Sequence, residues 1–227
     1  MAEIDNGKGG TVNTPNSPSI TDPKNESSFK GDNPHDRRGE KTTKGLPESI
    51  NEQMTKYLIS DKIIELLYNQ LQDELVNHNL YRSFALFYRS EGLFPLEKYF
   101  MMRAEEELLH HNWIFGYLAY CGIPLQYPEI PAINVDLKDK VTPFKFTQYK
   151  EIETTSTINE IAKEAMTEGD FGTLAWLNGN GAVEGKLIPE QTEEMSISND
   201  VYRISIQDND WMSKADAILS YYNSKRG

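Results

Sequence analysis

From residue 59 to residue 120, apolar residues recur three or four positions apart in two stretches that Gly92 separates. This spacing places them on one face of a helix. The first stretch predicts a helix that follows Ser60 as N-cap and ends near Ser90, and the second predicts a helix from Pro95 to Tyr120. The two buried stripes comprise Ile63, Leu67, Leu71, Glu74, His78, Tyr81, Ala85 and Tyr88, and then Leu96, Phe100, Arg103, Glu107, His110, Ile114 and Tyr117.

The next segment, residues 123–142, contains three prolines and cannot form one helix. It is long enough to run the length of a helical bundle. A third helix is expected over about residues 143–168, with Thr142 as cap candidate and Gly169 as the stop. The long connection between the second and third helices is one of the known four-helix-bundle topologies.

A fourth helix is expected to begin near Phe171, but the glycines and asparagines of residues 178–185 interrupt it. The helical pattern returns over residues 187–206, and a short fifth helix fits residues 210–223. The cap candidates of this last helix are Asp208 and Asn209. The sequence therefore predicts an all-α protein, and an all-helical arrangement without a metal stays open at this point.

The first fifty residues differ from the rest of the chain. They contain five of the eleven prolines, six of the fifteen glycines and few apolar residues. Such a segment buries too little apolar surface to offset the entropy lost on ordering. We therefore expect residues 1–50 to be a disordered low-complexity tail, and residues 51–227 to form the helical domain. The tail is interpreted as a spacer; a docking arm is the alternative.

Charge and composition exclude several classes of protein. The formal net charge of −12 argues against a protein that binds nucleic-acid phosphates through a basic face. The single cysteine excludes a disulfide framework. No apolar run has the ~20 residues of a membrane span, and the N-terminal residues lack the pattern of a signal peptide. We expect a cytoplasmic protein without membrane contact.

Acidic residues occupy the buried stripes, where a carboxylate is costly unless it is paired, neutralised or bound to a metal. Glu74 lies on the stripe of the first helix, and Glu107 and His110 lie on that of the second. Glu151 precedes small and apolar residues at helical spacing in the third. Because Glu107 and His110 are three positions apart, their side chains point the same way. Carboxylates with one imidazole suit iron or manganese, so the pattern suggests a shared cation.

Each of these residues also has a simpler explanation. A lone Glu-x-x-His pair occurs by chance in acidic helical proteins, and residues 105–107 are equally typical of a solvated acidic run. Tyr81 and Trp113 fit the core of an ordinary bundle, and His111 fits a surface or packing role better than that of a ligand. The metal hypothesis gains weight because several weak signals agree on one group of residues.

At these residues the sequence resembles the ferritins, most closely the non-haem bacterial type. The first matching stretch contains Glu74 and a tyrosine seven positions later, and the second reads Glu-Glu-x-x-His. The intervals of 33 residues from Glu74 to Glu107 and of 44 residues from Glu107 to Glu151 need no gap against that family. The matching stretches are Asn69–Tyr81, Ala104–His110, Glu151 with residues 158–162 and 168–171, and Glu190–Glu194.

The resemblance implies a ferritin-like bundle with a di-iron ferroxidase centre, at which Fe(II) is oxidised to Fe(III) by O₂. Glu74, Glu107 and His110 would hold one iron. Glu107 would bridge to a second iron, which Glu151 also binds, with Gln191 nearby. The acids that match a third, adjacent iron site are Glu106, Glu190, Glu193 and Glu194, and Tyr81 matches a tyrosine that is a candidate electron donor.

The family also implies iron storage as a mineral in a homo-oligomeric shell of twenty-four subunits. The charge of −11 on residues 51–227 fits the attraction of cations. Thr154 stands three positions after Glu151, where a symmetric centre would have histidine. This difference speaks against the haem-binding bacterioferritin branch.

The fourth helix departs from the family pattern. Alignment of Glu190–Glu194 with the family requires about seven additional residues, which fall within residues 178–186, and Lys186 stands where the family has a tryptophan. The acids there can also be explained as residues that favour the start of a helix. Two alternatives to a storage shell therefore stay open: a ferritin-like di-iron oxidoreductase without a cage, and a helical interaction protein that has lost the site.

Overall fold

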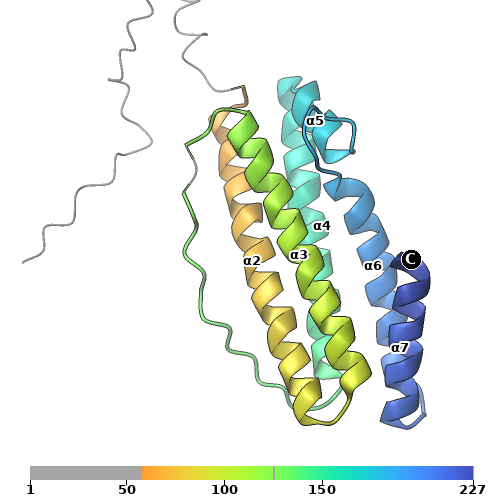
Figure 1. The fold of residues 1–227 in the computed structure, drawn as a ribbon. Helices are drawn as coiled ribbons and strands as arrows, with labels where there is room; N and C mark the ends of the chain where they lie inside the picture. Colours follow the sequence, from red (N-terminus) through yellow and green to blue (C-terminus); the bar gives the residue numbers. More distant parts are fainter. Residues whose placement is uncertain (1–57, 125, 227) are drawn as a thin grey trace, which may run out of the picture. The chain divides into compact units, whose positions relative to one another are not determined.

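The computed structural model describes residues 58–124 and 126–226, and in these residues the chain is helical, without a strand (Figure 1). The predicted tail over residues 1–50 lies outside the described residues, so both the tail and the division of the chain at residue 50 stay predictions. The helices are α2 (Asp61–Ser90), α3 (Phe94–Tyr120), α4 (Thr142–Glu168), α5 (Phe171–Leu177), α6 (Leu187–Ser205) and α7 (Trp211–Arg226).

The helices form the expected bundle with a long crossover. α2 and α3 are a pair joined by a tight turn, α4 packs against α2, and α5 with α6 runs back along α4 as an interrupted fourth helix (Figure 1). The crossover between α3 and α4 runs the length of α2. Two tyrosines of α2 fix its ends, since Tyr68 donates to the carbonyl of Pro124 (2.9 Å) and Tyr88 to that of Lys140 (2.6 Å).

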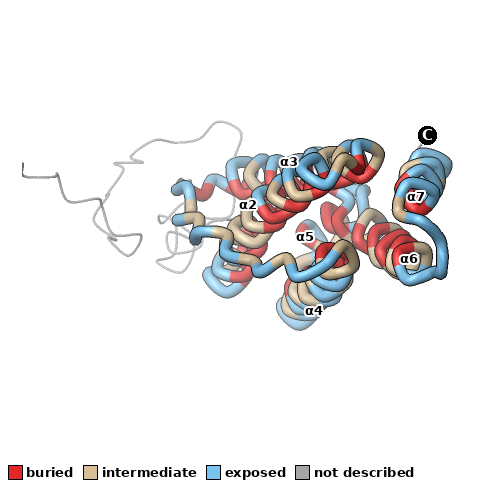
Figure 2. The backbone as a smooth tube through the Cα atoms, turned by 90° about the horizontal axis from the view of Figure 1, so that it is seen from below, coloured by how far each residue is buried: buried red, intermediate tan, exposed pale blue. Residues whose placement is uncertain are grey.

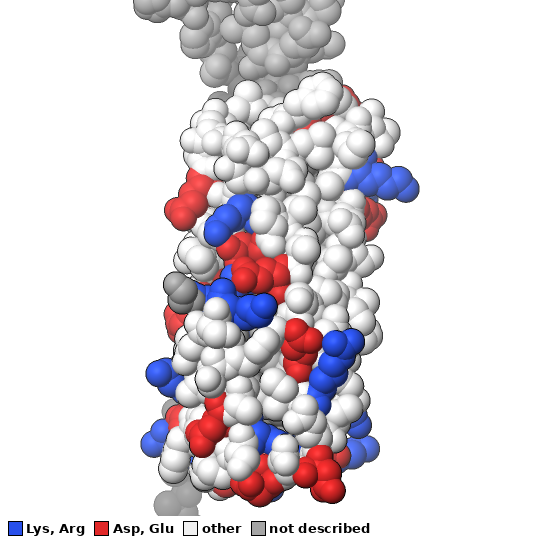
Figure 3. Space-filling model, turned by 90° about the vertical axis from the view of Figure 1, so that its right-hand side faces the viewer, with Lys and Arg blue, Asp and Glu red and all other residues white. Residues whose placement is uncertain are grey.

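The short last helix, α7, lies beside α6 and packs against both α3 and α6 (Figure 1). The expected fifth helix is thus confirmed, although it covers Trp211–Arg226 rather than residues 210–223. On the face turned to the viewer in Figure 3, acidic and basic side chains are intermixed.

The core consists of two apolar clusters. Every residue of the two stripes predicted for α2 and α3 is buried, and the buried positions face inward (Figure 2). One cluster contains Leu71, Trp113, Ile158 and Leu187, and the other contains Leu80. Along each of α2, α3, α4 and α6, buried polar residues lie between the segments that contribute to the two clusters. A polar layer that divides a core costs stability, so its residues are the first candidates for function.

Helix ends follow the sequence expectations in part. The Ser60 hydroxyl accepts from the amide of Ile63 (3.2 Å), which confirms it as the cap of α2. The expectation for Thr142 is wrong, because Thr142 is already helical and its amide is itself a donor that needs an acceptor. Asp139 supplies that acceptor at 2.8 Å. Similarly Asp210, rather than Asp208 or Asn209, accepts from the amide of Ser213 at the start of α7 (3.0 Å).

The insertion over residues 178–186 folds onto the bundle. The indole of Trp176 stacks on Tyr117 at 4.2 Å between ring centroids and donates to the carbonyl of Glu184 (3.0 Å). A Cβ at Gly185 would lie 2.0 Å from Trp176 Nε1, so only glycine fits there. The loop is therefore a packed element, and α6 begins directly after it at Leu187.

Within the part of the chain that the structure describes, no helix is both long enough and apolar enough to cross a membrane.

Candidate metal centre

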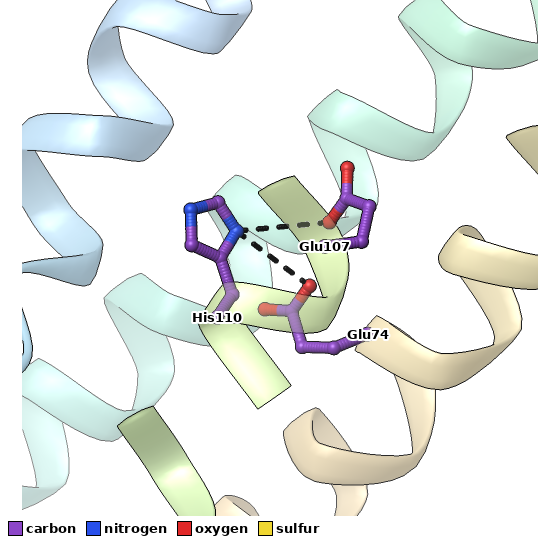
Figure 4. A group of neighbouring side chains, drawn as sticks. All are labelled: Glu74, Glu107 and His110. Carbon is purple, nitrogen blue, oxygen red and sulfur yellow. Dashed lines mark ion pairs between the residues drawn. The ribbon is translucent and has the colours of Figure 1, made fainter. Parts of the chain in front are cut away.

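Glu74, Glu107 and His110 meet in the polar layer of the bundle (Figure 4). Glu74 comes from α2 and the other two from α3, one helical turn apart. His110 Nδ1 lies 3.9 Å from Glu74 Oε2 and 3.7 Å from Glu107 Oε2. One ligand atom from each residue lies within 4.8 Å of the others, and all three residues are buried. Two carboxylates and an imidazole nitrogen thus converge on one small volume, as a metal site requires.

A hydrogen-bonded chain orients Glu74. Gln70, one turn earlier on α2, donates to Glu74 Oε1 (2.7 Å), and Thr157 of α4 donates to the amide oxygen of Gln70 (2.5 Å). Glu74 Oε2 has no hydrogen-bond partner among the described residues. A buried oxygen without a partner is costly. Because this oxygen faces His110, a bound cation would satisfy it, and the donor set therefore fits a metal ion.

Burial and charge shift the titration of these three groups strongly. Burial, and then the charge of Glu107, raise the pKa of Glu74 well above its usual range. Burial opposes ionisation of Glu107, but His110 and Arg103 outweigh it and lower its pKa. Burial likewise opposes protonation of His110, but the carboxylates of Glu194, Glu107 and Glu74 raise its pKa to about 10. The surrounding carboxylates thus favour the protonated form of His110.

Glu151 of α4 connects this group with α6. Its Oε1 accepts from the hydroxyl of Tyr81 (2.7 Å), and its Oε2 accepts from the amide of Gln191 (2.8 Å). Burial, and then the charge of Glu151, raise the pKa of Tyr81 well above its usual range, so the phenol stays protonated. The structure thus brings together Glu151, Gln191 and Tyr81, which the sequence analysis expected near one another, despite the insertion before α6.

Arg103 is the residue whose importance the sequence analysis missed. Its guanidinium is 1% exposed and lies among carboxylates of three helices. Nη2 lies 2.6 Å from Glu151 Oε1 and 3.4 Å from Glu107 Oε1, while Nη1 lies 2.9 Å from Glu194 Oε1 and 2.6 Å from Glu106 Oε2. The signal was present, because a base stood on a buried stripe four positions before Glu107. Its partners on α4 and α6 were not readable from spacing.

The four acids expected at a third iron position also lie together, around a second arginine. Arg226 at the end of α7 contacts Glu106 (2.9 Å), Glu190 (2.5 Å), Glu193 (3.1 Å) and Glu194 (3.1 Å). Sequence spacing gave no signal for Arg226, because it reaches these acids only through the packing of α7.

The four acids differ in environment. Glu193 has a side chain that is 42% exposed, whereas that of Glu194 is fully buried. Burial raises the pKa of Glu194 to about 8, although Arg103 and His110 oppose the shift. Glu194 Oε1 also lies 3.7 Å from His110 Nε2. This one carboxylate therefore connects the acids around Arg226 with the group of Glu74, Glu107 and His110.

The chain is similar to ferritins in sequence and in fold. A bacterial non-heme ferritin of Staphylococcus aureus (strain USA300) is 24% identical over 140 residues, which cover 62% of this chain and 80% of that protein. One of Staphylococcus haemolyticus is 23% identical over 139 residues, which cover 61% and 80%.

Solved structures give the same result for the fold. An open pore ferritin from Archaeoglobus fulgidus superposes with a TM-score of 0.64 at 24% identity, over 71% of this chain and 98% of that one. A Chlorobium tepidum ferritin superposes with a TM-score of 0.62 at 21% identity, over 74% and 97%.

The family model described as the ferritin-like domain matches residues 64–181. This match spans α2, α3, α4 and α5 and ends within the insertion, before Gln191 and Glu194. It nevertheless covers more than half of the chain and includes Glu74, Glu107, His110 and Glu151. The protein therefore belongs to the ferritin-like domain family.

Proposed function

We propose that this protein binds Fe(II) inside the bundle, oxidises it with O₂ and stores the Fe(III) as a mineral in an oligomeric shell. The observation that carries the proposal is the convergence of Glu74, Glu107 and His110 on one buried volume, with Glu74 Oε2 lacking a hydrogen-bond partner among the described residues. Family membership supports iron storage and ferroxidase activity at the level of the family.

The chemistry follows from the ligand types. Glu74 and Glu107 offer hard carboxylate oxygens and His110 offers one nitrogen, a set that suits iron. Each Fe(II) gives up one electron, and O₂ is the acceptor. Because Fe(III) is the harder and more highly charged ion, the carboxylates stabilise the product more than the substrate. Tyr81, which donates to Glu151, is the proposed additional electron donor during oxygen reduction.

The remaining acids are proposed to lead iron inward. The half-exposed Glu193 lies at the rim, Glu190 and Glu106 are largely buried, and Glu194 lies against His110. Carboxylates in this sequence lower the charge cost of moving a cation from water into the bundle. The resemblance implies a second ion at Glu107 and Glu151, with Gln191 nearby, but in the structure the Arg103 guanidinium lies 2.6 Å from Glu151 Oε1.

The test is iron oxidation by purified variants. Glu107→Gln and His110→Gln keep the size of each side chain but remove an ionic ligand or the imidazole. We expect both to lower the initial rate of aerobic Fe(II) oxidation, followed by ferric absorbance, by at least about tenfold, as loss of a ligand commonly does. Glu105→Gln is the matched control, since Glu105 lies on the same helix but is exposed. Unchanged rates in both ligand variants would contradict the proposal.

A second candidate is a bundle that no longer uses metal. Arg103 and Arg226 form direct ion pairs with six of the acids, as a purely structural network would. This candidate predicts no tight iron binding by the unaltered protein. Anaerobic Fe(II) binding that is lost on Glu74→Ala would argue against it, because Glu74 contacts neither arginine in the structure.

A further inference from the structure

A second group of carboxylates lies next to the first. One oxygen from each of Glu107, Glu151 and Glu194 lies within 4.8 Å of the others, and all three residues are buried. They come from α3, α4 and α6, so the fold itself assembles them. By position and chemistry this group could hold another cation beside the one proposed at Glu74, Glu107 and His110.

The guanidinium of Arg103 already fills that place. Its Nη2 lies 2.6 Å from Glu151 Oε1, and its Nη1 lies 2.9 Å from Glu194 Oε1. A divalent ion binds carboxylate oxygens at about 2.0–2.2 Å. An ion bound to both of these oxygens would overlap the guanidinium nitrogens, so Arg103 and such an ion exclude each other.

Arg103 is also fixed there. The side chain is 1% exposed, and its guanidinium carbon lies 5.6 Å from the ring centroid of Tyr81. Each terminal nitrogen contacts two carboxylates, an arrangement that suits the planar guanidinium far better than a point charge. Withdrawal of the side chain would leave Glu151 without its cation in the core and Glu194 with Arg226 as its remaining arginine. The occupied position is therefore the stable one.

The first site, in contrast, is free of arginine. Glu107 divides its two oxygens between the sites, with Oε2 toward His110 (3.7 Å) and Oε1 toward Arg103 (3.4 Å). Glu74 Oε1 accepts from Gln70, and Glu74 Oε2 has no hydrogen-bond partner among the described residues and faces His110 at 3.9 Å. Glu107 thus stands between a position open to a metal ion and a position already filled by a protein cation.

We infer that Arg103 replaces the second metal ion, so that each chain binds one divalent ion tightly where a dinuclear centre would bind two. This inference rests on the proposed function, because it assumes that the first site takes a metal. It assigns Arg103 as the residue that determines the metal stoichiometry of the centre.

The experiment counts bound ions with Co(II), which does not undergo the oxidation chemistry and so separates binding from activity. The purified full chain is equilibrated with Co(II), and bound metal per chain is measured by dialysis and elemental analysis. We expect one tightly bound ion in the unaltered protein and two in Arg103→Gln. Arg89→Gln is the matched control with one ion, since Arg89 pairs with Glu97 at the surface.

A charge-balanced variant controls for misfolding of Arg103→Gln. Arg103→Gln leaves Glu151 without its cation, so Arg103→Gln with Glu106→Gln is measured alongside it, because Glu106 also pairs with Arg103 (2.6 Å) but is not one of the three grouped carboxylates. This double variant keeps the net charge of the centre and retains Glu107, Glu151 and Glu194, and circular dichroism verifies its helix content. We expect two ions here as well.

The possible outcomes distinguish the inference from the proposed function. Two tightly bound ions in the unaltered protein, or one ion in both the unaltered protein and a folded Arg103 variant, would overturn the inference and leave the proposed function intact. No bound ion in the unaltered protein would overturn both. One ion that Glu74→Ala abolishes, together with a second ion in the Arg103 variants, would support both.

Discussion

At the scale of single residues, the centre is a balance of buried charges. Four carboxylates, those of Glu74, Glu107, Glu151 and Glu194, share the interior with the cations Arg103 and His110. Ionised groups in such surroundings are tolerated only when opposite charges or hydrogen-bond donors face them. Two carboxylate oxygens, Glu74 Oε2 and Glu194 Oε2, have no hydrogen-bond donor among the described residues, and Glu74 Oε2 faces the His110 imidazole at 3.9 Å. An oxygen that lacks a donor therefore belongs to a proposed metal ligand.

Gln70 is expected to act on the metal through Glu74. In Gln70→Ala the carboxylate loses its 2.7 Å donor and its fixed orientation, so the affinity for Fe(II) measured under anaerobic conditions should fall about 10- to 100-fold. Gln72→Ala is the control, because the amide of Gln72 lies on the same helix but donates to the carbonyl of Glu129 in the crossover. Equal affinities in the two variants would show that Gln70 does not position the ligand.

Individual residues of the centre differ in how well the sequence predicted their positions and contacts. Periodicity was sufficient to place Glu74, Glu107 and His110 in the interior, because burial on one helix depends on that helix alone. The position of Arg103 on the stripe was equally visible. Its partners Glu151 and Glu194 were not, because α3, α4 and α6 must pack before these residues meet. The contacts of Arg226 could not be predicted either. They depend on how α7 packs, and the hydrophobic pattern of this helix is short.

At the scale of elements, the insertion is a locally stabilised connection. The breakers of residues 178–185 correctly predicted the interruption, and α6 begins within a residue of expectation. The sequence did not reveal that the loop folds around Trp176. That contact depends on a glycine that faces an indole nine positions earlier in the chain. The contact between the loop and Trp176 fixes where α6 begins, so that Gln191 and Glu194 still face the centre after the interruption.

Gly185→Ala should therefore destabilise the bundle. The new methyl group would lie 2.0 Å from Trp176 Nε1, so the loop must shift and lose its hydrogen bond to the indole. We expect the free energy of unfolding in urea to fall by about 1–3 kcal/mol. Gly116→Ala is the control with the opposite sign. Gly116 lies within α3 with open space around it, so alanine should stabilise the helix by about 0.5–1 kcal/mol. A loss of similar size in both variants would contradict this account.

At the scale of the whole molecule, family membership and charge together favour storage over a lone binding site. The long-crossover bundle is the fold of the ferritins to which the chain is similar. Residues 51–227 carry a net charge of −11, which favours the accumulation of cations at the protein. The sequence predicted the topology because loop lengths restrict how helices can connect. It contained no readable signal for contacts between subunits, so the shell rests on resemblance.

The shell is tested by gel filtration after aerobic loading with excess Fe(II), with iron absorbance and protein followed together. We expect iron to elute with a particle near 24 copies of the 26.0 kDa chain, because Fe(III) without a chelator precipitates at neutral pH unless a shell encloses it. Glu107→Gln separates assembly from chemistry: its particle should have the same size but take up iron more slowly, since Glu107 lies inside the bundle. Protein that elutes as a 26.0 kDa monomer while iron precipitates would exclude storage. Oxidation at the normal rate under those conditions would leave a ferroxidase bundle without a cage.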